Sequence, residues 1–414
     1  MTVNSVAAQL LPGDSHVEVE PWHGFRYRRA SVVNVAVFLI SVAFCAYTVI
    51  GYPLLLALLA RWRGRPVRKA PLRATVSIVL PVHNGERWIA AKLESIRDLD
   101  YPPELVELLL VCDGCTDRTA EIGRAFTGIP KLTVIDLPRG GKAKALNAAL
   151  LRATGEILFF TDVRQHLDRA SLANLVSCFA DAQVGVASGE LVIRDAASRE
   201  EASVGLYWKY EKWIRKQLSR LDSVPGATGC IYAMRRSLAS PMPEDTLNDD
   251  MYLPLGAFFR GYRVILDETA LAYDYPTALG SEFRRKVRTL AGVYQIVKWY
   301  PALLGPRNRI WLHFFSHKLA RLLMPWAMLA AAFSAFALPA PWNAIAAAAQ
   351  ACAYLLALAD TWLPSGASLK RLTSPIRTFV VMMAASFCAL AILFVPARTL
   401  WKETRISSRI APSG

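Results

Sequence analysis

Three uncharged and strongly apolar stretches stand out along the chain, at residues 31–60, 322–359 and 378–397. Each is long enough to cross the hydrocarbon core of a bilayer, which is roughly 30 Å thick. The second stretch could hold two passes, because Pro339-Ala340-Pro341 interrupts it. We therefore predict a transmembrane anchor at 31–60 and about three transmembrane helices within 319–398.

A second pattern occupies the chain from about residue 75 to residue 280. Short apolar runs with the composition of buried strands alternate there with stretches of helical periodicity. Strands separated by helices of this length form right-handed βαβ units, so we predict an α/β domain with a mainly parallel sheet. The predicted strands are 76–82, 105–112, 132–137 and 156–161, and the predicted helices are 86–97, 116–126 and 142–153.

Polar clusters follow three of the predicted strands. Residues 83–86 (His-Asn-Gly-Glu) follow the first strand, residues 113–117 (Asp-Gly-Cys-Thr-Asp) follow the second, and Asp162 follows the fourth. Ligands of such sheets bind beyond the carboxyl ends of the strands. We expect the three clusters to converge at that edge.

Basic residues between Arg61 and Lys69 follow the first apolar stretch, which starts too late and is too long for a signal peptide. Basic flanks stay on the cytoplasmic side, so we predict an inner-membrane protein with its α/β domain in the cytoplasm. Three later spans would place the basic C-terminus outside, so we expect one apolar run to be re-entrant or interfacial. The remaining predicted segments are a polar tail (1–30), interfacial helices (281–318) and a basic tail (399–414).

Composition supports a membrane protein. Hydrophobic residues make up 54% of the 414 residues, and the net charge is +15. Lysine and arginine concentrate beside the apolar runs, which favours anionic lipid headgroups over nucleic acid. The seven cysteines show no Cys-x-x-Cys spacing, so we predict neither disulfides nor a zinc site.

Several residues of the α/β domain could bind a phosphorylated ligand. Asp113 either shapes a turn and caps a helix or accepts hydrogen bonds from a base or ribose. Gly140-Gly141-Lys142 opens a predicted helix, where free N–H groups favour an anion, although this signal is weak by itself. Asp162 ends an apolar strand, where an ionised carboxylate is costly unless it binds something such as a divalent cation.

Two adjacent carboxylates, Asp249 and Asp250, precede another helical pattern. The pair either caps this helix, which needs only one such acid, or includes a general base whose proton affinity is raised by its neighbour. Arg288 lies in a basic segment that either faces solvent and lipid or neutralises a leaving diphosphate.

Taken together, residues 76–292 resemble the family 2 glycosyltransferases. With the flanking apolar segments, they are similar to the membrane-anchored branch that includes the cellulose, hyaluronan and poly-N-acetylglucosamine synthases. Five motifs occur in the family's order. The matching residues are Pro81, Asn84 and Glu86; Asp113, Gly114 and Asp117; Gly141, Lys142 and Asn147; Asp162; and Asp249 with Asp250, and residues 226–229 also resemble the acceptor-side loop.

The resemblance implies a GT-A-type fold and a nucleotide-sugar donor. It assigns catalysis to Asp250 with Asp249, a divalent cation (Mg²⁺ or Mn²⁺) to Asp162, and the acceptor side to Gly226 and Gly229. The implied donor-binding residues are Pro81, Asn84, Glu86, Asp113, Lys142, Asn147 and Arg288. An inverting transfer to a lipid-linked or polysaccharide acceptor follows, typical of cell-envelope polysaccharide biosynthesis.

The sequence also departs from the family pattern. Arg164 replaces the second acid of Asp-x-Asp, Cys112 replaces the first acid of the second motif, and only Arg288 remains of Gln-x-x-Arg-Trp. Long-chain processive synthesis is therefore not expected. The alternatives are a polyprenyl-phosphate sugar synthase and a catalytically inactive membrane scaffold.

Overall fold

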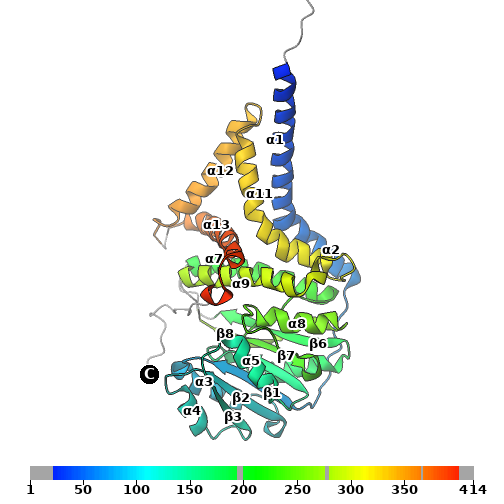
Figure 1. Cartoon of the computed structure of the whole chain (residues 1–414), viewed down its shortest axis with the longest axis vertical. Coiled ribbons are helices and arrows are strands. Elements are labelled where there is room, and N and C mark those ends of the chain that lie inside the picture. Colours follow the sequence, from blue (N-terminus) through cyan, green and yellow to red (C-terminus); the bar gives the residue numbers. More distant parts are fainter. Residues whose placement is uncertain (1–21, 194–198, 276–278, 365–366, 401–414) are drawn as a thin grey trace, which may run out of the picture.

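The computed structural model describes residues 22–193, 199–275, 279–364 and 367–400 (Figure 1). An α/β domain forms one end of the molecule, and long apolar helices extend from the other end. Two further helices, α7 (Arg199–Leu221) and α9 (Leu279–Trp299), lie between these parts. The predicted tails fall mainly at 1–21 and 401–414, outside the described residues.

A single eight-stranded sheet organises the α/β domain, in the order β3-β2-β1-β4-β7-β6-β8-β5. The strands β3, β2, β1 and β4 are parallel, as predicted. Strands β6 and β8 are parallel to each other and run in the same direction as β1 to β4. In contrast, β7 runs antiparallel to both β4 and β6, and β5 runs antiparallel to β8, so the sheet is mixed, with most of its strands parallel. The strands are β1 (Val76–Val82), β2 (Val106–Asp113), β3 (Leu132–Leu137), β4 (Ile157–Thr161), β5 (His166–Leu167), β6 (Val184–Ile193), β7 (Ile231–Arg235) and β8 (Arg263–Asp274).

Helices cover both faces of the sheet, which explains why its central strands are continuously apolar. Side chains alternate between the faces: Val79 of β1 belongs to one hydrophobic cluster, and its neighbours Ile78 and Leu80 belong to the other. The cluster around Val79 also includes residues of α5, α7, α8 and α9, so these helices cover one face. The domain's other helices are α3 (Glu86–Arg97), α4 (Thr119–Ala125), α5 (Lys142–Leu150), α6 (Ser171–Ser177) and α8 (Asp249–Phe259).

The apolar stretches form long helices. Helix α1 (Trp22–Ala46) begins before the predicted anchor at 31–60, and it continues through a π-helical turn into α2 (Tyr52–Arg63). The three later helices are α11 (Ala320–Ala335), α12 (Trp342–Ala359) and α13 (Lys370–Cys388). By length and composition, the candidate membrane spans among the described residues are Val32–Arg63, Trp342–Ala359 and Lys370–Leu393.

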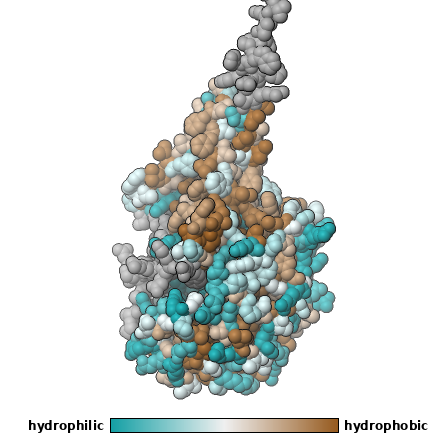
Figure 2. All heavy atoms as spheres, in the orientation of Figure 1, coloured by the Kyte–Doolittle hydropathy of each residue, from teal (hydrophilic) through white to brown (hydrophobic). Residues whose placement is uncertain are grey.

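Hydrophobic residues are prominent on the apolar helices in Figure 2, whereas hydrophilic residues dominate the α/β domain. Helix α11 packs against α1, and α13 packs against both α7 and α9. Between α9 and α11 the chain forms short turns, including α10 (Trp311–Phe314) and a π-helical turn at Phe315–Leu319. Helices α7 and α9 therefore connect the α/β domain to the apolar part of the molecule.

Candidate active site

Hydrogen bonds join the loops that follow β1 and β2. Asn84 adopts a positive φ of 47°, and its side-chain oxygen accepts a hydrogen bond from Thr116 N at 2.8 Å. Gly85 N donates to Thr119 Oγ1 at 2.8 Å, and Glu86 N donates to an Asp117 carboxylate oxygen at 2.9 Å. These contacts confirm that the two strand ends converge. Pro81 lies within β1, opposite Val111 of β2.

Asp113 ends β2 with its side chain buried, and it organises the glycine turn before α5. Its carboxylate accepts hydrogen bonds from Gly140 N at 2.6 Å and from Gly141 N at 2.9 Å, and it pairs with Arg139. Gly141 has a φ of 92°, a conformation that favours glycine. Asp113 thereby sets the position at which α5 begins, directly before Lys142.

Lys142 brings three distant elements together. Its Nζ lies 3.0 Å from Asp162 Oδ1, at the end of β4, and 3.3 Å from Asp249 Oδ2, at the start of α8. Burial disfavours the charged amine, but Asp162, Asp249 and Asp250 outweigh this effect and raise the pKa of Lys142. The site therefore holds a fixed cation between two carboxylates.

Asp249 and Asp250 form the first turn of α8. Asn248, the residue before the helix, donates its side-chain amide to Thr289 O of α9 at 2.8 Å, which ties the two helices together. Burial, together with the charge of Asp249, raises the pKa of Asp250 from 3.8 to about 6, although Lys142 opposes the shift. Asp250 can therefore gain and lose a proton near neutral pH, as a general base must.

The loop 226–229 packs directly against Asp250. Ala227 N donates to Asp250 O at 2.7 Å, and a Cβ atom added to Gly229 would lie 3.1 Å from an Asp250 carboxylate oxygen. Glycine at this position leaves space beside the carboxylate. Gly226 also lies close to α8, since an added Cβ would lie 2.6 Å from Met251 Cγ.

Arg215 of α7 holds this loop, and no sequence motif marks it. Its guanidinium donates to Thr228 Oγ1 at 3.0 Å and to Gly226 O at 3.2 Å. Burial lowers the pKa of Arg215, and Glu211 and Asp250 partly offset that effect. Arg215 is therefore a cation beside the candidate base that could be found only from the fold.

Arg288 of α9 also comes close to the acids. Burial lowers its pKa, whereas the charges of Asp249, Asp250 and Asp162 act in the opposite direction. The structure thus brings Arg288 into the electrostatic environment of the site.

Two predicted donor-binding residues are engaged in contacts of their own. Asn147 exchanges two hydrogen bonds with the backbone of Met242, at 2.7 Å and 2.9 Å, which fixes the loop before α8. Glu86 pairs with Arg118 at 2.6 Å. These bonds position loops around the site, and the structure does not bring either side chain to Lys142.

The structure also explains how the unusual Arg164 is accommodated. Arg164 pairs with Asp274 of β8, and Gln165 donates to the same carboxylate at 2.8 Å. No group of three or more His, Cys, Asp or Glu side chains suited to a metal occurs among the described residues. The Asp162 side chain is 38% exposed, and it fits a divalent cation whose other ligands are water and phosphate oxygens.

Tyr232 of β7 is a further residue of the site that no motif indicates. Its ring stacks on Phe160 with centroids 4.5 Å apart, and its hydroxyl is buried without a hydrogen-bond partner among the described residues. The charges of Asp249, Asp250 and Asp162 reinforce the effect of burial and raise its pKa. The Tyr232 hydroxyl therefore lies within the electrostatic environment of the three carboxylates of the site.

This α/β fold, with polar side chains gathered at the strand ends, is a GT-A-like glycosyltransferase fold. Residues 77–241 match the family described as Glycosyl transferase family 2. The predicted enzyme class is confirmed, whereas the membrane-anchored branch stays a prediction.

Known proteins agree with this class. The solved mannosyltransferase PcManGT from Pyrobaculum calidifontis, in complex with GDP-Man and Mn²⁺, matches with a TM-score of 0.68 and 28% identity, covering 86% of this chain and 99% of that one. Probable glycosyltransferase YdaM of Bacillus subtilis is 23% identical over 242 residues, covering 54% of this chain and 56% of the relative. An N-acetylglucosaminyltransferase of Rhizobium meliloti is 29% identical over 247 residues, covering 54% and 57%. The chain thus spans about half the length of these curated relatives.

Proposed function

We propose that the protein is an inverting glycosyltransferase. It transfers a sugar from a nucleotide-diphosphate sugar to a hydroxyl of a lipid-linked or polysaccharide acceptor at the inner membrane. The environment of Asp250 carries this proposal. Its pKa is raised to about 6, and its carboxylate lies beside Gly229 of the acceptor-side loop. Such a carboxylate is poised to remove a proton from a hydroxyl nucleophile.

In this mechanism, Asp250 deprotonates the acceptor hydroxyl, which attacks the anomeric carbon of the donor from the side opposite the diphosphate. Lys142 and Arg288 lie close to the carboxylates of the site and offset the charge that develops on the leaving diphosphate. A divalent cation held by Asp162 would add Lewis-acid stabilisation of that leaving group. The solved mannosyltransferase complex with GDP-Man and Mn²⁺ supports both ligand classes.

The loops at the strand ends support donor binding, and the apolar helices support a membrane location. Asp113 and the turn it organises, together with the loop containing Asn84, border the site at the strand ends where ligands of such sheets bind. Three candidate spans support a membrane location, and the basic residues that follow the first of them favour a cytoplasmic α/β domain. The absence of Gln and Trp around Arg288 argues against long-chain processive synthesis.

The alternative of a polyprenyl-phosphate sugar synthase is less well supported. A phosphate nucleophile is already anionic near neutral pH and needs no base, whereas the environment of Asp250 is suited to accepting a proton. Sugar attached directly to a lipid phosphate would nevertheless favour the synthase.

A donor screen tests the proposed function. Purified full-length protein is incubated with single nucleotide sugars, membrane lipid extract and Mg²⁺ or Mn²⁺, and both nucleotide release and labelled products are measured. We expect turnover of at least one donor and a loss of roughly 10²–10⁴-fold in Asp250→Asn. Asp245→Asn, at an exposed position in the preceding loop, is the matched control. If no donor is bound or turned over, the inactive scaffold becomes the better explanation.

A further inference from the structure

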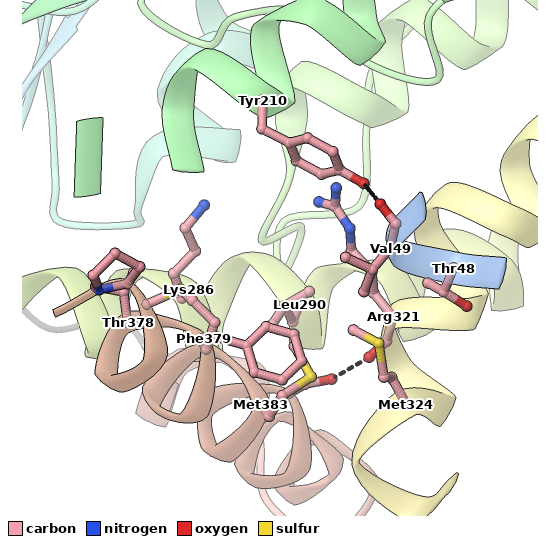
Figure 3. A pocket seen from close by; sticks show the side chains of 13 residues that line it. Thr48, Val49, Tyr210, Lys286, Leu290, Arg321, Met324, Thr378, Phe379 and Met383 are labelled. Carbon is pink, nitrogen blue, oxygen red and sulfur yellow. Dashed lines mark hydrogen bonds between the residues drawn. The ribbon is translucent and has the colours of Figure 1, made fainter. Parts of the chain in front are cut away.

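A cavity of about 230 Å³ lies where α7, α9, α11 and α13 meet the turn after α1 (Figure 3). Its walls are mainly apolar. Leu290, Phe379 and Met383 gather on one side of the cavity, whereas Lys286 and Arg321 extend toward α7 on the other. The cavity is therefore amphipathic, with a hydrocarbon-like part and a cationic part.

The cationic part is ordered by polar contacts. Tyr210 donates its hydroxyl to Val49 O at 3.0 Å, and the Arg321 guanidinium lies 5.9 Å from the Tyr210 ring centroid. Arg321 also pairs with the buried Glu211, which lies 3.1 Å from His317 Nε2. These contacts fix Arg321 at the edge of the cavity.

Several cations lie close together around Glu211 among the residues that the structure describes. The half-buried Lys318 lies beside Glu211, and the nearby cations are Arg321, Arg215 and Lys286. Burial lowers the pKa of Lys318 to about 8; Glu211 opposes this shift, and the other cations add to it. A phosphate bound here would gain charge-assisted hydrogen bonds and relieve repulsion among the cations.

Helix α7 connects this cavity to the candidate base. Tyr210 lines the cavity, and Arg215 holds the loop that packs against Asp250. Five residues of helix correspond to about 7.5 Å along its axis. The charge of Lys318 acts both on Asp250 and on the cavity cations Arg321 and Lys286, so Lys318 lies electrostatically between the cavity and the candidate base.

We propose that this cavity binds the acceptor as a lipid in which a phosphate joins the hydrocarbon chain to a hydroxyl-bearing head. The phosphate lies against Lys286 and Arg321, the head reaches the loop beside Asp250, and the hydrocarbon chain lies against α11 and α13. This inference rests on the proposed function, because it specifies the acceptor of the same reaction.

The chemistry of the walls favours a lipid over a polysaccharide. Burying apolar surface against Leu290, Phe379 and Met383 stabilises a hydrocarbon chain by about 25 cal/mol per Å². A polysaccharide in the same place would lose hydrogen bonds to water that apolar walls cannot replace. One wall is α13, which belongs to a candidate membrane span, so a lipid could enter from the bilayer.

A competition experiment tests the proposal with three probes that separate the contributions of tail and phosphate. Fluorescent phosphatidylinositol is bound to the full-length protein in neutral detergent micelles and followed by anisotropy. Unlabelled phosphatidylinositol should compete, whereas glucosyl diacylglycerol, which lacks phosphate, and inositol phosphate, which lacks a tail, should each compete roughly tenfold less well.

Two variants locate the binding. Met383→Trp fills the apolar part, and Lys286→Met removes a cation; each should weaken binding roughly tenfold. Leu372→Trp is the matched control, because Leu372 lies on the same helix, outside the cavity, and is 58% exposed. It should bind like the wild type.

Three results would overturn the proposal: no saturable binding, equal competition by either incomplete probe, or equal weakening by Leu372→Trp and Met383→Trp. Donor turnover is measured on the wild type in the same preparation. Lipid binding without donor turnover would refute the proposed enzyme while leaving the lipid site intact. Donor turnover without specific lipid binding would refute only the lipid site.

Discussion

The raised pKa of Asp250 predicts how stability and activity change with pH. The perturbation is Asp250→Asn, which keeps the shape of the side chain and removes its charge. Moving the pKa from 3.8 to about 6 corresponds to about 3 kcal/mol against ionisation in the folded protein, at about 1.36 kcal/mol per pKa unit. Because Asp250 is only half-buried, this value is an upper bound.

The sign of the pH dependence follows from the direction of the shift. The folded protein holds the Asp250 proton more tightly than the unfolded chain, so this group's contribution to stability falls as pH rises from about 4 to about 6. Asp250→Asn should therefore stabilise the protein by up to about 3 kcal/mol at pH 7.5 but by only about 1 kcal/mol at pH 4.5. Thermal unfolding in detergent should show a gap of roughly 5 °C or more at the higher pH.

The same substitution should abolish most transfer activity, so stability and activity change in opposite directions. Asp245→Asn provides the control, since that side chain is exposed. A gap between wild type and Asp250→Asn that stays constant from pH 4.5 to pH 7.5, or a less stable variant at pH 7.5, would refute the claim that Asp250 is held with a raised pKa. In the wild type, the rate of transfer should fall on the acid side with a midpoint near pH 6.

Three further substitutions probe the surroundings of Asp250. Asp162→Asn should raise the Mn²⁺ concentration for half-maximal donor turnover roughly tenfold or more, and an unchanged Mn²⁺ titration would exclude Asp162 as a metal ligand. Arg215→Gln removes the hydrogen bonds from Arg215 to Thr228 and Gly226. The KM for the acceptor should therefore rise roughly tenfold, with a smaller change in the KM for the donor. Equal changes in both KM values would show that the loop 226–229 does not bind the acceptor. Tyr232→Phe should leave the melting temperature unchanged or raise it, because the Tyr232 hydroxyl has no hydrogen-bond partner among the described residues. The same substitution should lower kcat/KM roughly tenfold. Full activity would show that the hydroxyl does not contact the ligand.

The first half of the fold could be predicted from local sequence patterns. Strands β1 to β4 are short apolar runs separated by helices, and both faces of their parallel arrangement are covered. The second half could not be predicted in this way, because α7 separates β6 from β7 and the chain then re-enters the sheet in the antiparallel direction. Periodicity predicts a strand but carries no information on its direction.

Some residues of the candidate site could be predicted from local sequence patterns, and others could not. Lys142, Asp162 and Asp249 lie in motifs and meet as expected, because each begins a helix or follows a strand at the same edge of the sheet. Arg215 and Tyr232 come from the middle of a helix and of a strand, where nothing in the local sequence distinguishes a ligand-facing side chain from a packed one. Only the crossing of α7 over the loop beside Asp250 gives Arg215 its position.

The replacement of a family carboxylate by Arg164 does not by itself make the site inactive. An arginine beside Asp162 would compete with a divalent cation if its charge faced the donor. Instead, Arg164 pairs with Asp274 on β8, whose side chain is buried, so its charge is neutralised within the sheet. Lys142 meanwhile supplies a cation that contacts both Asp162 and Asp249. Because Asp274 balances the charge of Arg164 and Lys142 remains beside the two carboxylates, the replacement by itself does not favour an inactive scaffold.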